Sequence, residues 1–136
     1  MAYKTVFEID GANFHTLEGF YDEVSRVLIP GAVWGRNLDA FDDILSGGFG
    51  TPEEGFVLRW RNSRASREQL GYLETMRQLN MSLRRCHPSN RTQIKEKIED
   101  ARMGRGPTVF DWLVEIILDH GPGGRYSEDG VELILE

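Results

Sequence analysis

The chain has 136 residues, of which 40% are hydrophobic and 28% are charged, and its formal net charge is -6. This length and composition predict one globular domain, residues 1–136, and argue against two. No apolar run approaches the roughly 18 residues of a membrane helix, and the first residues lack the basic-then-apolar pattern of a secretory signal. We therefore expect a cytoplasmic protein with no membrane contact. The single cysteine, Cys86, excludes an internal disulfide and provides no metal-binding pair.

The first half of the chain predicts a strand, two helices and a second strand. Residues 4–9 form a short β-prone run that the turn dipeptide Asp10-Gly11 closes. Thr16 can cap a helix whose apolar residues recur at three-and-four spacing, and Asn37 can cap a second, shorter helix. Residues 55–62 begin with an apolar triplet and predict a mostly covered strand.

The second half predicts three more helices and a last strand. Ser66 and Gln69 have the spacing of a capping box, which predicts a helix that reaches Arg85. Residues 91–103 predict a surface helix. Thr108 and Asp111 have a capping arrangement, and they begin a helix over residues 108–118 that is apolar nearly all round and therefore deeply packed. Residues 131–135 close the chain as a strand. This order of elements requires crossover connections, so we expect an α/β fold with three parallel strands.

Charge is segregated along the sequence. Twelve basic and only five acidic residues lie between Arg59 and Arg105, so an acidic body carries a basic middle. These cations can pair with the acidic body or bind a nucleic acid or another partner. We favour the first interpretation, because the charge is spread over two helices and forms no concentrated patch.

The short helix after Asn37 is the most informative segment. At 100° per residue its apolar and acidic side chains fall on opposite sides, the first group being Leu38, Phe41, Ile44 and Leu45 and the second Asp39, Asp42 and Asp43. From composition alone, such an acidic face is most often merely solvated. The alternative is a binding face which, with an exposed Trp34 beside it, suits a cationic cleft. A nuclease active site is such a cleft, because it holds RNA phosphates with lysine and arginine.

Two segments resemble the Barstar family. WGRNLDAFDDIL, residues 34–45, is similar to the family signature, and FVLRWRN, residues 56–62, resembles its second strand. With the order of elements at both ends, the resemblance covers residues 4–62 and 108–135. It implies a three-stranded parallel sheet packed by helices. Residues 63–107 depart from the family as a helical basic insertion, which is much longer than the family's connection between the second strand and the last helix. It also implies an intracellular inhibitor of a small basic ribonuclease, or an immunity protein against a related toxin, which blocks the active site with helix-borne carboxylates.

The resemblance also implies roles for single residues. Asp43 corresponds to the central anionic anchor and Asp39 to a second carboxylate, while Glu115 matches a family glutamate on the last helix. Val33 and Asp42 stand where the family has aromatic residues, so the rim of the site has lost apolar contacts and gained charge. The full expected partner-binding set is Val33, Trp34, Gly35, Asn37, Leu38, Asp39, Asp42, Asp43, Ser46 and Glu115.

Two other classes of function compete with the inhibitor. One is a non-inhibitory interaction module of the same fold, whose basic insertion binds nucleic acid or mediates self-association. The other is an enzyme in which the three aspartates hold a magnesium ion, but no second acidic element and no phosphate-gripping loop accompanies them. The three histidines, His15, His87 and His120, lie in separate elements without a serine or cysteine partner motif. We therefore expect no catalysis, no cofactor and no bound metal.

Overall fold

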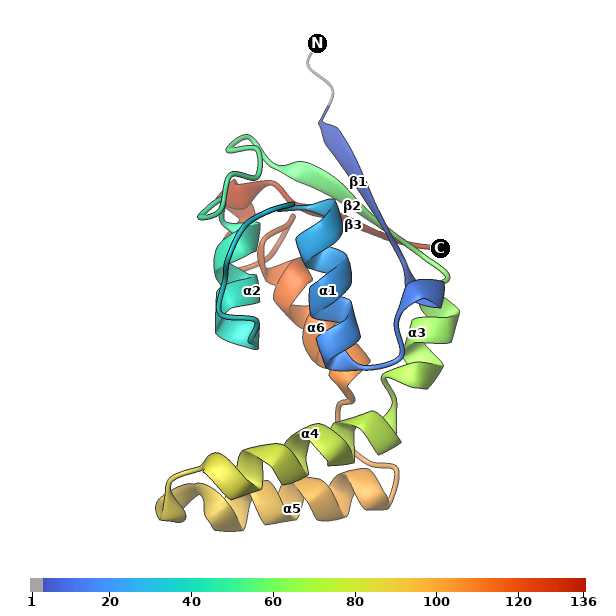
Figure 1. Cartoon of the computed structure of the whole chain (residues 1–136), viewed down its shortest axis with the longest axis vertical. Coiled ribbons are helices and arrows are strands. Elements are labelled where there is room, and N and C mark those ends of the chain that lie inside the picture. The colour runs from blue at the N-terminus through green and yellow to red at the C-terminus, as the bar shows by residue number, and fades with distance from the viewer. Residues whose placement is uncertain (1–3) are drawn as a thin grey trace.

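The computed structural model describes residues 4–136 and shows the expected α/β fold (Figure 1). Three strands and six α-helices form it, together with short 3-10 turns. In chain order the elements are β1 (Thr5–Asp10), α1 (Leu17–Val27), α2 (Leu38–Leu45), β2 (Phe56–Arg61), α3 (Ser63–Gln69), α4 (Tyr72–Arg85), α5 (Arg91–Arg102), α6 (Val109–Asp119) and β3 (Glu132–Leu135).

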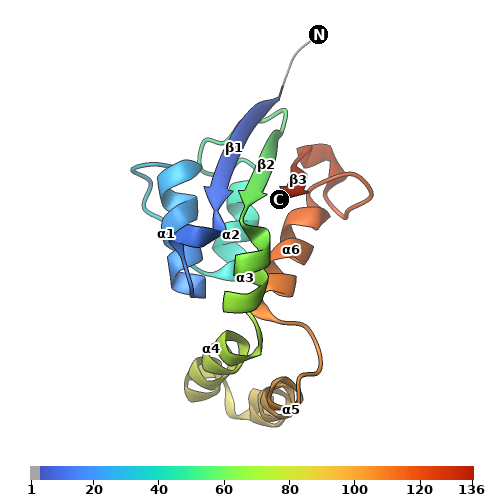
Figure 2. The same ribbon diagram turned by 90° about the vertical axis from the view of Figure 1, so that its right-hand side faces the viewer.

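The strands are parallel and lie side by side in the order β1-β2-β3, as the crossover argument predicts. Both crossovers step across the sheet in the same direction. Since such connections are right-handed, they place their helices on the same face. Figure 2 shows α1, α2 and α6 together behind the sheet. The opposite face carries charged pairs, such as Arg59 with Glu8 at 3.1 Å.

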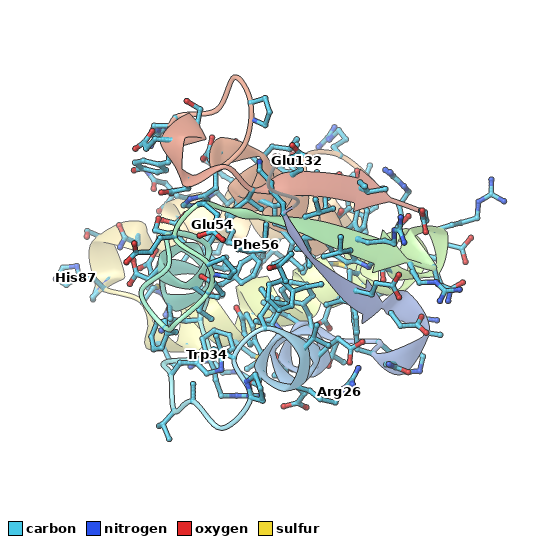
Figure 3. All side chains as sticks on the ribbon, turned by 90° about the horizontal axis from the view of Figure 1, so that it is seen from above. Arg26, Trp34, Glu54, Phe56, His87 and Glu132 are labelled. Carbon is cyan, nitrogen blue, oxygen red and sulfur yellow. The ribbon has the colours of Figure 1, made fainter. Side chains whose placement is uncertain are left out.

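The core fills the space between the sheet and these helices (Figure 3). Phe56 and Trp60 of β2 are completely buried. Phe56 packs edge-on against Phe7 of β1 at 5.3 Å between ring centroids, and Trp60 is stacked on Phe20 of α1 at 5.4 Å. The helix starts predicted at Thr16 and Asn37 are confirmed, and Thr108 forms a full capping box with Asp111. These caps satisfy backbone N–H groups that have no partner within the helix.

The predicted helix from Ser66 to Arg85 is wrong in two respects. The chain breaks at Leu70 and Gly71 into α3 and α4, and Ser66 lies inside α3 rather than at a cap. Its hydroxyl instead accepts a hydrogen bond from the indole of Trp60 at 2.9 Å. The last helix is also less enclosed than predicted, because Leu118 is 54% exposed.

Helices α4 and α5 form an antiparallel hairpin that lies crosswise at one end of the body (Figure 1). We call these residues, 72–102, the α4–α5 hairpin. Leu79 and Ala101 are its buried apolar residues, so its packed interior is small. The hairpin therefore depends on polar contacts with the body for its position.

Candidate functional site

Helix α2 is fixed on one side and open on the other. The amide N–H of Ala40 donates to the side-chain oxygen of Asn37 at 2.8 Å, which caps the first turn. Phe41 and Ile44 are completely buried, so the helix cannot rotate without exposing its apolar side. Asp39 and Asp43 are exposed on the opposite side, as the spacing predicts.

Asp42 departs from the predicted acidic face. It is half-buried, and its carboxylate lies 2.7 Å from Nε2 of His120. The other ring nitrogen, Nδ1, lies 2.7 Å from the carboxylate of Asp129, which also accepts a hydrogen bond from Ser46 at 2.8 Å. Sequence spacing could not reveal this cluster, since His120 is 78 positions from Asp42.

The His120 cluster joins the end of α2 to the loop before β3. His120 is fully buried, and both of its ring nitrogens face carboxylate oxygens. Both contacts are hydrogen bonds only when the ring carries a proton on each nitrogen. Ser46 and Asp129 meet the same ring nitrogen, and the Ser46 hydroxyl donates its hydrogen bond to Asp129.

The loop before α2 also differs from expectation. Trp34, predicted to be exposed, is only 8% exposed; its indole N–H donates to Ser25 at 2.6 Å, and its ring packs edge-on against Tyr21. Figure 3 shows Trp34 beside α1. Val33, by contrast, is 95% exposed and projects from the loop. Val33 is thus the exposed apolar side chain of this loop, whereas Trp34 is buried against α1.

Arg36 holds this loop in place, a role that the sequence did not indicate. Its φ of 52° is a left-handed conformation that non-glycine residues rarely adopt. Its guanidinium pairs with Asp22 of α1, donates to the backbone oxygen of Glu18 and lies over the ring of Trp34. These contacts offset the backbone strain and tie the loop to α1.

A groove of about 520 Å³ separates this loop and the start of α2 from α4. Asn37, Leu38 and Asp39 line one wall, and one face of α4 lines the other with Gln78, Met81, Ser82 and Arg85. Predicted site residues thus lie beside the α4–α5 hairpin. Gly35 is exposed in the loop just outside the groove.

Glu115 is placed apart from this groove. It is exposed on α6 and lines a separate depression of about 380 Å³ with Asp111 and Asp119. The structure therefore groups Asn37, Leu38 and Asp39 in one groove, whereas Glu115 lines a separate depression.

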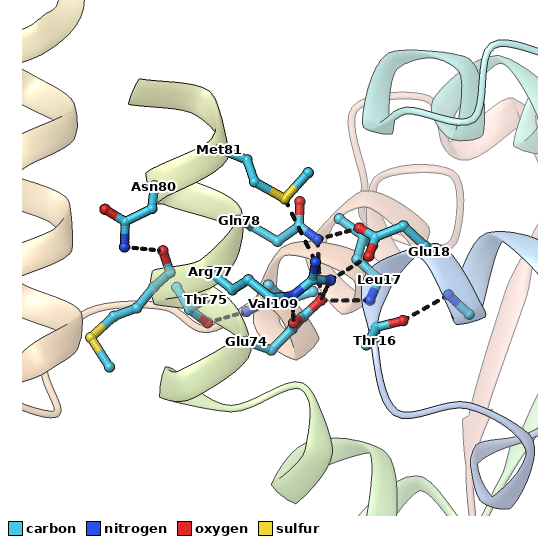
Figure 4. Close-up of polar contacts among 12 residues, drawn as sticks. Thr16, Leu17, Glu18, Glu74, Thr75, Arg77, Gln78, Asn80, Met81 and Val109 are labelled. Atoms are coloured by element: carbon cyan, nitrogen blue, oxygen red, sulfur yellow. Dashed lines mark hydrogen bonds and ion pairs between the residues drawn. The ribbon is translucent and has the colours of Figure 1, made fainter. Parts of the chain in front are cut away.

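The near end of the hairpin is joined to the body through Glu74 (Figure 4). This carboxylate is 6% exposed and accepts hydrogen bonds from the backbone N–H of Leu17 at 2.8 Å, from Arg77 and from Gln78. Arg77 and Gln78 also bind Glu18 of α1. Burial alone would raise the pKa of Glu74, but these hydrogen bonds together hold it below its ordinary value.

Thr75 makes a second connection in the same turn of α4. Its hydroxyl accepts a hydrogen bond from the backbone N–H of Val109, the first residue of α6, at 2.9 Å. Two side chains of α4 thus satisfy N–H groups at the starts of α1 and α6. Such caps between helices fix the hairpin rigidly on the body.

The basic residues between Arg59 and Arg105 divide into three groups. Arg59, Arg61 and Arg77 pair with acids of the body, whereas Arg102 and Arg105 pair with acids of α5. Within residues 4–136, several cations form no ion pair, and those at or near the far end of the hairpin are Arg84, Arg85, Arg91 and Lys95. Pairing with the acidic body therefore accounts for only part of the basic segment.

Among residues 4–136 no three metal-ligating side chains converge, and Asp42 faces His120 rather than Asp39 and Asp43. None of the helices in this part of the chain is long and apolar enough to cross a membrane. The site is an acidic surface on a short helix, flanked by a groove.

The fold and this surface define a class: small parallel α/β domains that present carboxylates on a short helix. The sequence model of the Barstar family, described as "Barstar (barnase inhibitor)", matches residues 4–101. The chain therefore belongs to the Barstar family. No curated protein matches it significantly. The family match continues through α3, α4 and most of α5.

Proposed function

We propose that this protein is an intracellular inhibitor of a small basic ribonuclease, or an immunity protein against a related toxin, and not an enzyme. The observation that carries the proposal is the pair of exposed carboxylates, Asp39 and Asp43, on a helix whose other side is buried. In a Barstar-family chain, such a pair suits a cationic cleft in which each carboxylate takes the place of a substrate phosphate.

The rigidity of the face supports this role. Association costs less free energy when the contacting groups are already ordered. Asn37 caps α2, Arg36 clamps the preceding loop, and the His120 cluster holds the helix end through Asp42. Asp39 and Asp43 would then bind without a prior ordering of the backbone.

The surroundings of the predicted partner-binding residues indicate which of them would contact a partner and which would position the others. We assign direct contact to Asp39 and Asp43, and to Val33 and Leu38 as the neighbouring apolar groups. Gly35 shapes the contact loop, and the residues that would act by positioning are Trp34, Asn37, Asp42 and Ser46, whose side chains bind within the chain. Glu115 would contact only a partner that extends along α6 beyond Trp112, to the depression that Glu115 lines.

Inhibition of RNA cleavage by a panel of barnase-type ribonucleases tests the proposal. We expect the wild type to inhibit at least one enzyme at equal concentration and Asp43→Ala to lose most of this inhibition. Glu68→Ala, which removes an exposed carboxylate from α3, is the matched control and should inhibit like the wild type. If no enzyme is inhibited, or if Asp43→Ala inhibits as well as the wild type, the proposal fails.

A second candidate rests on the far end of the hairpin, where Arg84, Arg91 and Lys95 form no ion pair within residues 4–136. A non-inhibitory module could use these cations to bind nucleic acid or a second copy of the chain. RNA binding of this kind weakens steeply with salt, because phosphate contacts release counterions. Salt-dependent RNA binding that Arg84→Ala and Arg91→Ala reduce would favour this candidate, and absence of binding at low salt would contradict it.

A further inference from the structure

The groove between α2 and α4 contains four charged side chains, of which two are paired within the chain. Glu18 is bound by Arg77 and Gln78, and Arg36 is bound by Asp22. Asp39 and Arg85 line opposite walls and form no ion pair with any residue from 4 to 136. The groove therefore presents one free anion and one free cation.

This combination restricts what can occupy the groove. A uniformly cationic surface would suit Asp39 but would bring positive charge against Arg85, which is unfavourable when water is excluded. A surface that places an acidic group next to its cationic cleft satisfies both walls. Leu17, Tyr21 and Trp112 also line the groove and give the occupant an apolar floor.

The α4 wall cannot easily move aside. Its first turn is fixed to α1 through Glu74 and to α6 through Thr75, and breaking these contacts would leave buried polar groups without partners. Figure 1 shows α4 crossing the end of the body near the start of α2. A partner that docks on Asp39 must therefore fit the hairpin as it stands.

We propose that the groove receives an acidic side chain on a segment of the target ribonuclease beside its cationic cleft, and that Arg85 binds it. The α4–α5 hairpin then determines which ribonucleases the protein accepts: those with an acidic rim bind, and those with a basic rim are excluded. This inference rests on the proposed inhibitor function, since it concerns the same partner.

A charge reversal with a neighbouring control tests the inference. Arg85 shares one face of α4 with Gln78, Met81 and Ser82, whereas exposed Arg84 points about 100° away from Arg85 around the helix. Arg85→Glu and Arg84→Glu change the net charge equally. We expect Arg85→Glu to raise the inhibition constant by about tenfold or more and Arg84→Glu by about twofold or less. Arg85→Lys should retain most of the inhibition, because it keeps the charge.

The outcomes separate this inference from the proposed function. If the wild type inhibits a ribonuclease, Asp43→Ala does not, and Arg85→Glu behaves like Arg84→Glu, the groove proposal alone is overturned. If the wild type inhibits none of the panel, both proposals fail. Binding of single-stranded RNA should be measured on the same variants. A loss of RNA binding in Arg85→Glu with unchanged inhibition would assign Arg85 to nucleic acid and overturn the inference as well.

Discussion

The two ends of the α4–α5 hairpin carry opposite kinds of polar residue. At the near end, Glu74 and Thr75 are buried and bind backbone groups of α1 and α6. At the far end, Arg84, Arg85 and Arg91 are exposed and form no ion pair within residues 4–136. The α4–α5 hairpin thus combines polar side chains that bind to the body with cations that are exposed to solvent.

This difference shows that burial, rather than the number of charges, separates the two roles. The carboxylate of Glu74 has lost its water and has replaced it with four hydrogen-bond donors from Leu17, Arg77 and Gln78. The cations at the far end, Arg84, Arg85 and Arg91, remain hydrated, so they contribute little to the stability of the fold. Because the near end is rigid, the far end has a defined position relative to α2.

Of the substitutions that we consider, we expect removal of the Glu74 carboxylate to have the largest effect on stability. Glu74→Ala should lower the free energy of unfolding by about 3 kcal/mol, because it leaves the buried N–H of Leu17 without a partner and removes the acceptor of the hydrogen bonds from Arg77 and Gln78. Urea denaturation followed by circular dichroism measures this. Glu68→Ala removes an exposed carboxylate and should change stability by less than about 0.5 kcal/mol. Equal effects of the two variants would contradict the structural role of Glu74.

The next prediction concerns pH and the same carboxylate. Since the pKa of Glu74 is lower in the folded state than in the unfolded chain, the unfolded state binds more protons in the acid range. The stability from Glu74 is then present above the unfolded pKa and is lost as the pH falls through the folded one. Denaturation of the wild type and Glu74→Gln between about pH 7 and pH 3 should show the difference in their stabilities shrinking toward acid pH. A constant difference would contradict the assignment.

The sequence predicted those parts of the fold that local signals determine. Thr16, Asn37 and Thr108 were identified as caps, because a capping side chain and its target N–H lie within three residues. The break between α3 and α4 was missed. There the decisive contact is between Ser66 and Trp60, and the spacing of Ser66 and Gln69 imitates a capping box without forming one.

For the candidate site, too, the sequence predicted what local spacing determines and missed what distant contacts determine. Helical spacing placed Asp39 and Asp43 on the exposed side of α2, and the structure agrees. The burial of Trp34 and the contact of Asp42 with His120 were not predictable, because each depends on an element distant in sequence or on the path of a loop. The role of Arg36 was hidden for the same reason, since its ion-pair partner Asp22 lies in α1.

The smallest predicted effect lies at the far end of the hairpin and completes the comparison. Arg84→Ala should change the free energy of unfolding by less than about 0.5 kcal/mol, because Arg84 is exposed and has no ion pair within residues 4–136. Any change should be slightly stabilising, since one of several neighbouring cations is removed, and it should fade as salt screens their repulsion. Urea denaturation at low and high salt measures both. A loss of about 2 kcal/mol or more, comparable to that of a buried polar group, would mean that the far end also belongs to the folded network.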